Sequence, residues 1–175
     1  MIEIRCSVLL KGQIGLFAVR NLKKGTCVGY SERLDEKLHS WAEYARLDSK
    51  TKRMIDKYCA STAEGFWGPV DINYISLPWH MNHCCAGNVG FNEQGDFVTI
   101  KYVRAGAELS YDYGLLITNP KFKLACQCGS RNCRKIITGN DWLDPSYRRK
   151  NTNIMAPELR DTKKTRKSPL QSGEL

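Results

Sequence analysis

Residues 106–114 read GAELSYDYG and residues 126–134 read CQCGSRNCR, and these two stretches carry the most specific patterns in the chain. Tyr111 and Tyr113 stand two residues apart, so on an extended segment both rings point to the same face. Two phenol rings on one face can wall an apolar slot and present hydroxyl groups at its base. A cross-strand aromatic pair in a core gives the same pattern, so the two tyrosines alone leave both interpretations open.

The second stretch has the spacing C-x-C-x4-C, formed by Cys126, Cys128 and Cys133. A structural zinc ion takes four ligands, nearly always Cys or His, in tetrahedral geometry. Three ligands are local, so the fourth has to come from another segment. Upstream, residues 82–88 (NHCCAGN) supply three candidate donors: His83, Cys84 and Cys85. Free thiols are the alternative, because unpaired cysteine is often buried.

The upstream stretch also carries a neighbouring amide and imidazole, Asn82 and His83. Such a pair can present hydrogen-bond donors and acceptors to a polar ligand. Taken alone, the pair is better explained as part of a capped turn in which the histidine forms hydrogen bonds within the protein.

Short strand patterns separated by glycine turns predict a mostly β fold. Residues 2–10 alternate apolar and polar side chains, which is the period of a half-buried strand. Residues 16–19 form a second apolar run, after a glycine turn at 11–15. Residues 97–103 (FVTIKYV) form the best strand pattern in the chain.

Two segments depart from this strand pattern. Within residues 31–60, helical spacing relates four apolar side chains, Leu34, Leu38, Trp41 and Ala45, and predicts a short amphipathic helical insert. Residues 148–175 are polar and basic and predict a disordered tail.

Composition narrows the class of protein. The 175 residues carry 27 Lys and Arg against 18 Asp and Glu, a net charge of +9, which favours anionic partners and leaves nucleic-acid contact through the basic tail open. No apolar run reaches the roughly 18 residues of a membrane span, so no membrane association is expected. The N-terminus lacks the pattern of a secretory signal, so we expect an intracellular protein of nucleus, cytoplasm or chromosome, not a secreted one. Eight cysteines in that setting indicate thiols or metal ligands.

Taken in order, four stretches resemble the SET-domain protein-lysine N-methyltransferases with a post-SET zinc segment. They are KGQIGLFA (11–18), NHCCAGN (82–88), ELSYDYG (108–114) and CQCGSRNCR (126–134). The resemblance implies a SET fold of several small sheets, with pseudoknot-like threading near the Asn-His motif. It places a SET domain at 2–118, with the helical insert at about 31–60, and a post-SET zinc segment at 122–143.

The resemblance also implies a chemistry. The methyl donor is S-adenosylmethionine, and the acceptor is a lysine of a partner protein such as a histone or another basic protein. Implied cofactor-binding residues are Gln13, Ile14, Gly15, Asn82, His83 and Tyr113. Implied catalytic residues are Tyr113 and Tyr111. Implied zinc ligands are Cys85, Cys126, Cys128 and Cys133, because the family's cysteine at the fourth position of the Asn-His motif falls on Cys85.

Tyrosine at position 111, where the family carries Tyr or Phe, predicts monomethylation, because its hydroxyl leaves less room for a methylated amine. A catalytically silent SET-like module that binds a peptide or protein is the alternative function. A zinc-ribbon nucleic-acid binder would use the cysteines and the basic charge, but it leaves the tyrosine and Asn-His motifs unexplained.

Overall fold

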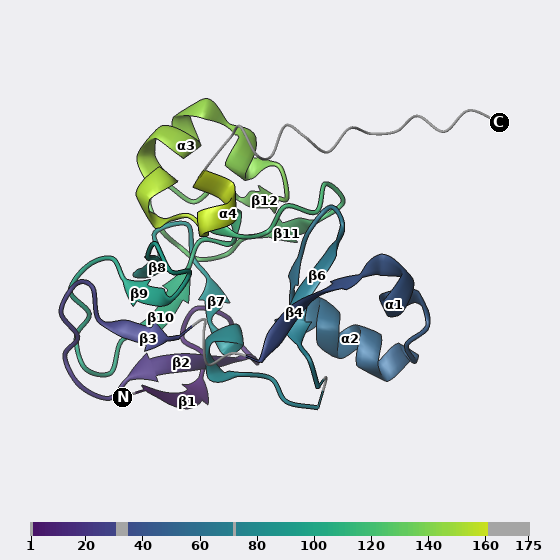
Figure 1. The fold of residues 1–175 in the computed structure, drawn as a ribbon. Coiled ribbons are helices and arrows are strands. Elements are labelled where there is room, and N and C mark those ends of the chain that lie inside the picture. The colour runs from purple at the N-terminus through teal and green to yellow at the C-terminus, as the bar shows by residue number, and fades with distance from the viewer. Residues whose placement is uncertain (1, 31–34, 72, 161–175) are drawn as a thin grey trace.

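Short strands dominate the part of the chain that the computed structural model describes, residues 2–30, 35–71 and 73–160 (Figure 1). One sheet has the order β1-β2-β10-β8-β9-β3, with β7 paired to β10. Its strands are β1 (Ile2–Cys6), β2 (Ile14–Ala18), β3 (Cys27–Gly29), β7 (Asn82–His83), β8 (Val89–Phe91), β9 (Phe97–Thr99) and β10 (Glu108–Tyr111). The mostly β fold class predicted from the sequence is confirmed.

Strand β10 lies at the centre of this sheet and brings the predicted motifs together. It pairs antiparallel with β2 and parallel with β7, where Tyr111 lies opposite His83. Asn88 fixes this arrangement, because its Nδ2 donates to the Glu108 carbonyl at 2.8 Å and its Oδ1 accepts from the Ser110 amide at 3.0 Å. The Asn-His and Tyr-Asp-Tyr segments, separated in the sequence, therefore lie side by side.

The predicted helical insert is only partly helical. Residues Glu36–Ser40 form strand β4, which pairs with β6 (Gly65–Pro69), and β6 also pairs with β5 (Ala60–Ser61). Helix α1 (Trp41–Ala45) starts only after Ser40, whose hydroxyl forms a capping box with Glu43, and α2 (Ser49–Tyr58) follows. The helical prediction is wrong for Leu38, because its pairing with Trp67 across the sheet outweighs the helical spacing. Leu34 lies outside the described residues.

The tail prediction also needs correction. After β11 (Lys123–Ala125) and β12 (Ile136–Thr138), the chain continues through η4 (Asp141–Leu143), α3 (Pro145–Asn151), η5 (Thr152–Ile154) and α4 (Pro157–Arg160). The prediction of disorder from residue 148 onward is wrong for residues 148–160, because Met155, Ala156 and Leu159 are buried in the main core. The composition of this segment is polar and basic, so it did not indicate that the few apolar residues in it would be buried. Residues 161–175 lie outside the described part.

The strand expected at 97–103 is shorter than predicted. Only Phe97–Thr99 form β9, and Val103 makes an isolated bridge to Leu22. Two 3-10 turns lie next to the Asn-His and Tyr-Asp-Tyr segments: η2 (Leu77–His80) leads into β7, and η3 (Tyr113–Leu115) follows β10. No helix within the described ranges is long and apolar enough to span a bilayer.

Candidate functional site

A cavity of about 360 Å³ lies where η2, β7 and η3 meet, and we call it the Asn-His cavity. Five of the predicted cofactor-binding residues line it: Gln13, Ile14, Asn82, His83 and Tyr113. Further lining side chains, which no sequence motif indicated, are Tyr58, Trp79, Phe122 and Leu124. Its volume lies at the small end of the range of about 300–1,000 Å³ for ligand sites. Gly15 and Tyr111 do not line it.

Asn82 is held rigidly at the wall of this cavity. Its Nδ2 donates to the Ile14 carbonyl at 2.9 Å and to Glu108 Oε1 at 2.8 Å. Both amide protons are therefore used inside the protein. The carbonyl oxygen Oδ1 is left as the acceptor that Asn82 can offer to an ammonium group of a ligand.

Glu108 organises the loop beside Asn82. Its carboxylate accepts hydrogen bonds from the Ser7 hydroxyl at 2.8 Å and from the Val8 amide at 2.8 Å, in addition to Asn82. Gly15 packs closely against this carboxylate, since a Cβ there would lie 2.3 Å from Glu108 Oε1. Gly15 therefore does not line the cavity, but its lack of a side chain lets Glu108 lie close to Asn82. Glu108 belongs to a motif visible in the sequence, but its partners lie far away along the chain.

His83 is buried and neutral at physiological pH. Burial lowers the pKa of His83 to about 4, and this outweighs the opposing effect of Asp112. Its Nδ1 accepts from the Tyr113 amide at 3.1 Å, which leaves the ring proton on Nε2, 3.4 Å from Cys85 Sγ. His83 thereby connects the start of η3 to the cysteine cluster.

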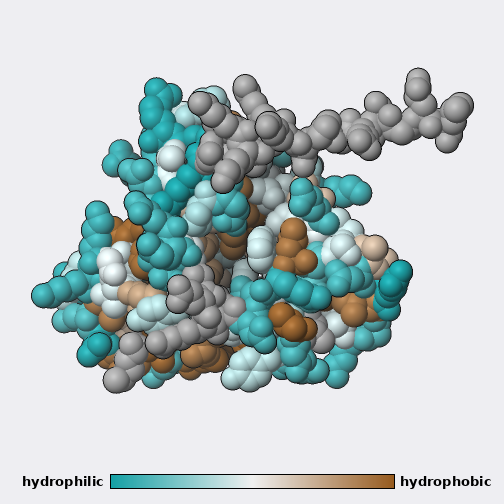
Figure 2. All heavy atoms as spheres, viewed as in Figure 1, coloured by the Kyte–Doolittle hydropathy of each residue, from teal (hydrophilic) through white to brown (hydrophobic). Residues whose placement is uncertain are grey.

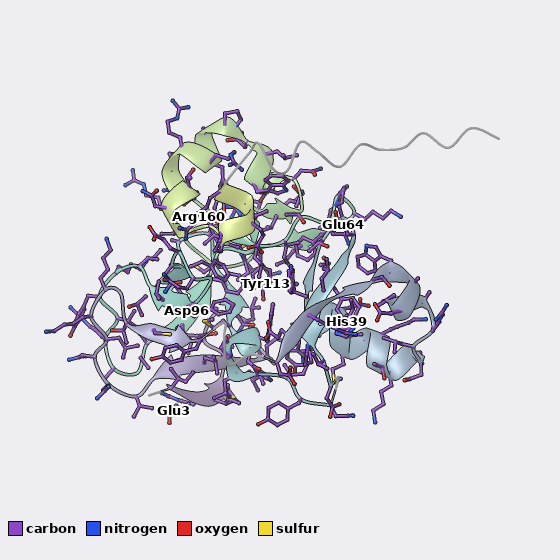
Figure 3. The ribbon with its side chains drawn as sticks, viewed as in Figure 1. Glu3, His39, Glu64, Asp96, Tyr113 and Arg160 are labelled. Atoms are coloured by element: carbon purple, nitrogen blue, oxygen red, sulfur yellow. The ribbon has the colours of Figure 1, made fainter. Side chains whose placement is uncertain are left out.

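The rings of Tyr111 and Tyr113 contact each other, and Figure 3 shows Tyr113 near the centre of the molecule. Their ring centroids are 4.9 Å apart. The Tyr113 hydroxyl donates to the Met81 carbonyl at 3.1 Å, and burial raises the pKa of Tyr113 to about 12, so it stays protonated. Tyr111 is 4% exposed, and burial, followed by the nearby Tyr113 and Glu36, raises its pKa well above the usual value. Tyr113 therefore faces the cavity and Tyr111 stands beside it in the core.

Four cysteines converge from two distant segments. The Sγ atoms of Cys85, Cys126, Cys128 and Cys133 all lie within 4.8 Å of one another. The Cys85 and Cys126 sulfurs are 3.8 Å apart, close to the edge of about 3.8 Å that a ZnS4 tetrahedron with 2.3 Å bonds would have. The donor set therefore fits zinc in a structural site.

Arg134 joins this cysteine segment to the Tyr-Asp-Tyr segment. Its guanidinium donates to both carboxylate oxygens of Asp112, at 2.5 and 2.6 Å, and to Asp141 at 3.0 Å. Its backbone amide donates to Cys85 Sγ at 3.4 Å. We call these side-chain hydrogen bonds the Arg134 fork. Asp112 stands directly before Tyr113, so the Arg134 fork holds the cysteine segment against the start of η3. Arg134 ends the CQCGSRNCR stretch, but nothing in the sequence names its partner.

A second cavity, also of about 360 Å³, shares Trp79 with the Asn-His cavity. Phe91 and Phe97 line it, and their ring centroids lie 6.1 and 5.6 Å from that of Tyr111. A series of contacting aromatic rings thus runs from this second cavity through Tyr111 and Tyr113 to the Asn-His cavity. The pair of cavities could hold two reactants on either side of the tyrosines.

Comparison with known proteins identifies the family. The model of the SET domain matches residues 13–114, which is more than half of the chain. The chain belongs to the SET-domain family. Among curated proteins, Histone-lysine N-methyltransferase 2D of Homo sapiens and that of Mus musculus are each 35% identical over 63 residues, covering 32% of this chain and 1% of the relative.

Several solved structures of Polycomb Repressive Complex 2 are similar to this chain. One, described as ctPRC2 in an autoinhibited conformation bound to S-adenosylmethionine, is 27% identical with a TM-score of 0.46 and covers 67% of this chain and 16% of its own. Another, a humanized mutant of the Chaetomium thermophilum complex bound to the inhibitor GSK343, is 26% identical with a TM-score of 0.47, covering 68% and 16%. The chain thus spans a small part of each relative.

Proposed function

We propose that this protein is an S-adenosylmethionine-dependent protein-lysine N-methyltransferase. The observation that carries the proposal is the position of Tyr113 and Trp79. Trp79 lines both cavities, and Tyr113 lines the Asn-His cavity while its ring contacts Tyr111, which packs against the aromatic wall of the second. Methyl transfer needs two ligands that approach one centre from separate sides. Membership of the SET family and the resemblance to histone-lysine methyltransferases support this reading.

The methyl donor would occupy the Asn-His cavity. Asn82 Oδ1 can accept from an ammonium group, the rings of Tyr58 and Phe122 give flat apolar walls, and Gln13 and Ile14 close one side. S-adenosylmethionine bound there supplies a methyl group on a positively charged sulfur. Gly15, which the resemblance assigned to this ligand, would act indirectly through the position of Glu108.

The acceptor lysine would enter through the second cavity. A lysine side chain has an ordinary pKa of about 10.4, so it must lose a proton before it can attack. The apolar rings of Phe91, Phe97 and Trp79 would remove water from the amine, and the positive sulfur of the donor would repel its charge. Both effects lower that pKa and oppose the effect of Glu36, which lines the same cavity. Water can carry the proton away. The Tyr113 hydroxyl, fixed by the Met81 carbonyl, orients the reacting groups, and alignment is the main contribution of the protein.

Tyr111 would limit the product to monomethyl-lysine. It is almost fully buried among Phe91, Phe97 and Tyr113, so its hydroxyl has little freedom to move aside. A methylated amine needs extra space and must also rotate its lone pair toward the donor. Both requirements become harder beside a fixed hydroxyl group.

Zinc held by Cys85, Cys126, Cys128 and Cys133 would be structural, because four protein ligands leave no open position. We propose SET and post-SET units at 2–118 and 122–143, joined by this ion and by the Arg134 fork. A histone or another basic protein is the proposed substrate class, and nucleus, chromosome or cytoplasm is the proposed location.

A titration with S-adenosylmethionine tests the proposal before any substrate is known. The full chain should bind the compound with one-to-one stoichiometry, and Asn82→Ala should weaken binding strongly. Asn153→Ala, an exposed asparagine in η5, is the matched control and should bind like the unmodified protein. Absence of binding by the unmodified chain would favour a silent peptide-binding module.

A further inference from the structure

The second cavity combines aromatic walls with glutamate side chains, and we call it the glutamate recess. It lies between β4 and β6 on one side, the β8–β9 turn on another and α4 on a third. Trp67, Trp79, Phe91 and Phe97 supply its aromatic surface. Figure 2 shows hydrophobic residues in the recess at the centre of this face and hydrophilic residues around it. Its location beside Tyr111 makes it the entrance for the acceptor under the proposed function.

The charge of the glutamate recess is opposite to that of the chain. Glu36, Glu93 and Glu158 line it, and among its described lining residues there is no lysine, arginine or histidine. The whole chain carries a net charge of +9. Three carboxylates from three separate segments, β4, the β8–β9 turn and α4, therefore gather at one cavity of a strongly basic protein. A field of this sign attracts cationic ligands and repels anionic ones.

Glu36 is the innermost of the three carboxylates. The Trp79 indole N–H donates to its Oε1, and no described lysine or arginine forms an ion pair with it. Burial raises the pKa of Glu36 to about 7, although the Trp79 hydrogen bond opposes this, and Tyr111 and Cys59 are the titratable groups that face it. A half-buried carboxylate with no cation beside it in the described part of the chain is costly, and a ligand cation would offset that cost. Among the described residues, none donates a hydrogen bond to its second oxygen.

We propose that the glutamate recess selects substrates whose target lysine lies in a positively charged segment. Glu36 pairs with a cationic neighbour of the target lysine, held against the Trp79 and Trp67 rings, and Glu93 and Glu158 at the rim face further basic residues of the same segment. Aromatic faces next to carboxylates are favourable surroundings for ammonium and guanidinium groups. The inference rests on the proposed function for its location, and it adds the residues that would select for basic neighbours of the target lysine.

Binding of two peptides to the full chain tests the inference without any methyl transfer. Both peptides carry one central lysine; one has arginine and lysine neighbours, and the other has glutamine and serine in their place. At pH 8 and low salt, the basic peptide should bind the unmodified protein at least about tenfold more tightly, and added salt should weaken it. Equal affinity for the two peptides would overturn the inference.

Charge-removing variants locate the effect. Glu93→Gln and Glu158→Gln, both at exposed positions, should each weaken the basic peptide about two- to fourfold and leave the neutral peptide unchanged. Glu36→Gln should weaken it about tenfold or more, as expected for a partly buried charge pair. Glu3→Gln removes the same charge from β1, away from the recess, and should have no effect (Figure 3). The rim variants keep the test valid even if Glu36→Gln disturbs Trp79.

The outcomes separate this inference from the proposed function. If the rim variants bind the basic peptide as tightly as the unmodified chain, the charge requirement is wrong even when methyl transfer occurs. If they lose affinity but no lysine is ever methylated, the recess recognises basic peptides and the proposed function fails.

Discussion

Replacing Arg134 with alanine would cut the main connection between the cysteine segment and the Tyr-Asp-Tyr segment. The guanidinium makes two short hydrogen bonds to Asp112 and one to Asp141 at 3.0 Å, and it lies over the Tyr147 ring at 5.0 Å. The Asp112 side chain is only 10% exposed, so alanine at position 134 leaves a nearly buried carboxylate without its cation. The substitution therefore costs more than the lost hydrogen bonds alone.

The magnitude follows from this geometry. Removing one partner of a buried ion pair costs about 3–5 kcal/mol. The Arg134 side chain is 27% exposed, so water screens part of the interaction and the lower end of that range applies. We expect a loss of about 3 kcal/mol in the free energy of unfolding. For a chain of this size each kcal/mol shifts Tm by about 2–4 °C, so Tm should fall by about 6–12 °C.

Thermal unfolding followed by circular dichroism, with zinc present, measures this loss. Arg131→Ala is the matched control, because Arg131 is an exposed arginine of the same segment, and its Tm should change by less than about 2 °C. Turnover in Arg134→Ala should also fall below that of the control at a temperature where both are folded, since Asp112 precedes Tyr113. Equal Tm values for the two variants would refute the reasoning.

Three further predictions concern the metal, the product and the pH dependence. Metal analysis should find one zinc per chain. Cys85→Ser should lose that zinc while Cys84→Ser, which changes the neighbouring buried thiol, keeps it; metal retention in Cys85→Ser would contradict the ligand set. Tyr111→Phe should shift the product from monomethyl- toward di- and trimethyl-lysine in mass spectra, because about 1.4 kcal/mol already changes a rate ratio tenfold; an unchanged distribution would count against it. Since the pKa of Glu36 is raised from 4.5 to about 7, its favourable contribution to stability is present below about pH 4.5 and is lost as pH rises through 7. Glu36→Gln should therefore gain stability relative to the unmodified protein between pH 5 and pH 8 in urea unfolding, and parallel pH curves would contradict this.

Local motifs predicted much of the site because each contains its own chemistry. The spacing of Tyr111 and Tyr113 predicts two neighbouring rings, and they do contact each other, whereas their catalytic role came only from the family resemblance. The convergence of Cys85 with the downstream cysteines followed from the resemblance, and the structure brings these sulfurs together. Glu36 gave no signal, because it acquires its environment only through the pairing of β4 with β6 and the approach of Trp79.

The errors in the fold share one physical cause. Leu38 has the spacing of a helical residue, but an available partner strand decides its conformation. Met155 and Leu159 stand in a segment too polar to predict a core, yet both are almost completely buried against the main cluster. In each case a contact between distant segments overrides the local pattern, and such contacts are not visible in one sequence.

The central claim is that Tyr113 sits at a centre for methyl transfer to lysine. The most direct measurement incubates the full chain with methyl-labelled S-adenosylmethionine, histones and a cell lysate, followed by mass spectrometry of the labelled peptides. Label should appear on lysine side chains, and Tyr113→Phe should lower turnover by about 100-fold or more while it leaves the fold and the affinity for S-adenosylmethionine nearly unchanged. The account is contradicted if no lysine acquires label, or if Tyr113→Phe turns over at the rate of the unmodified protein.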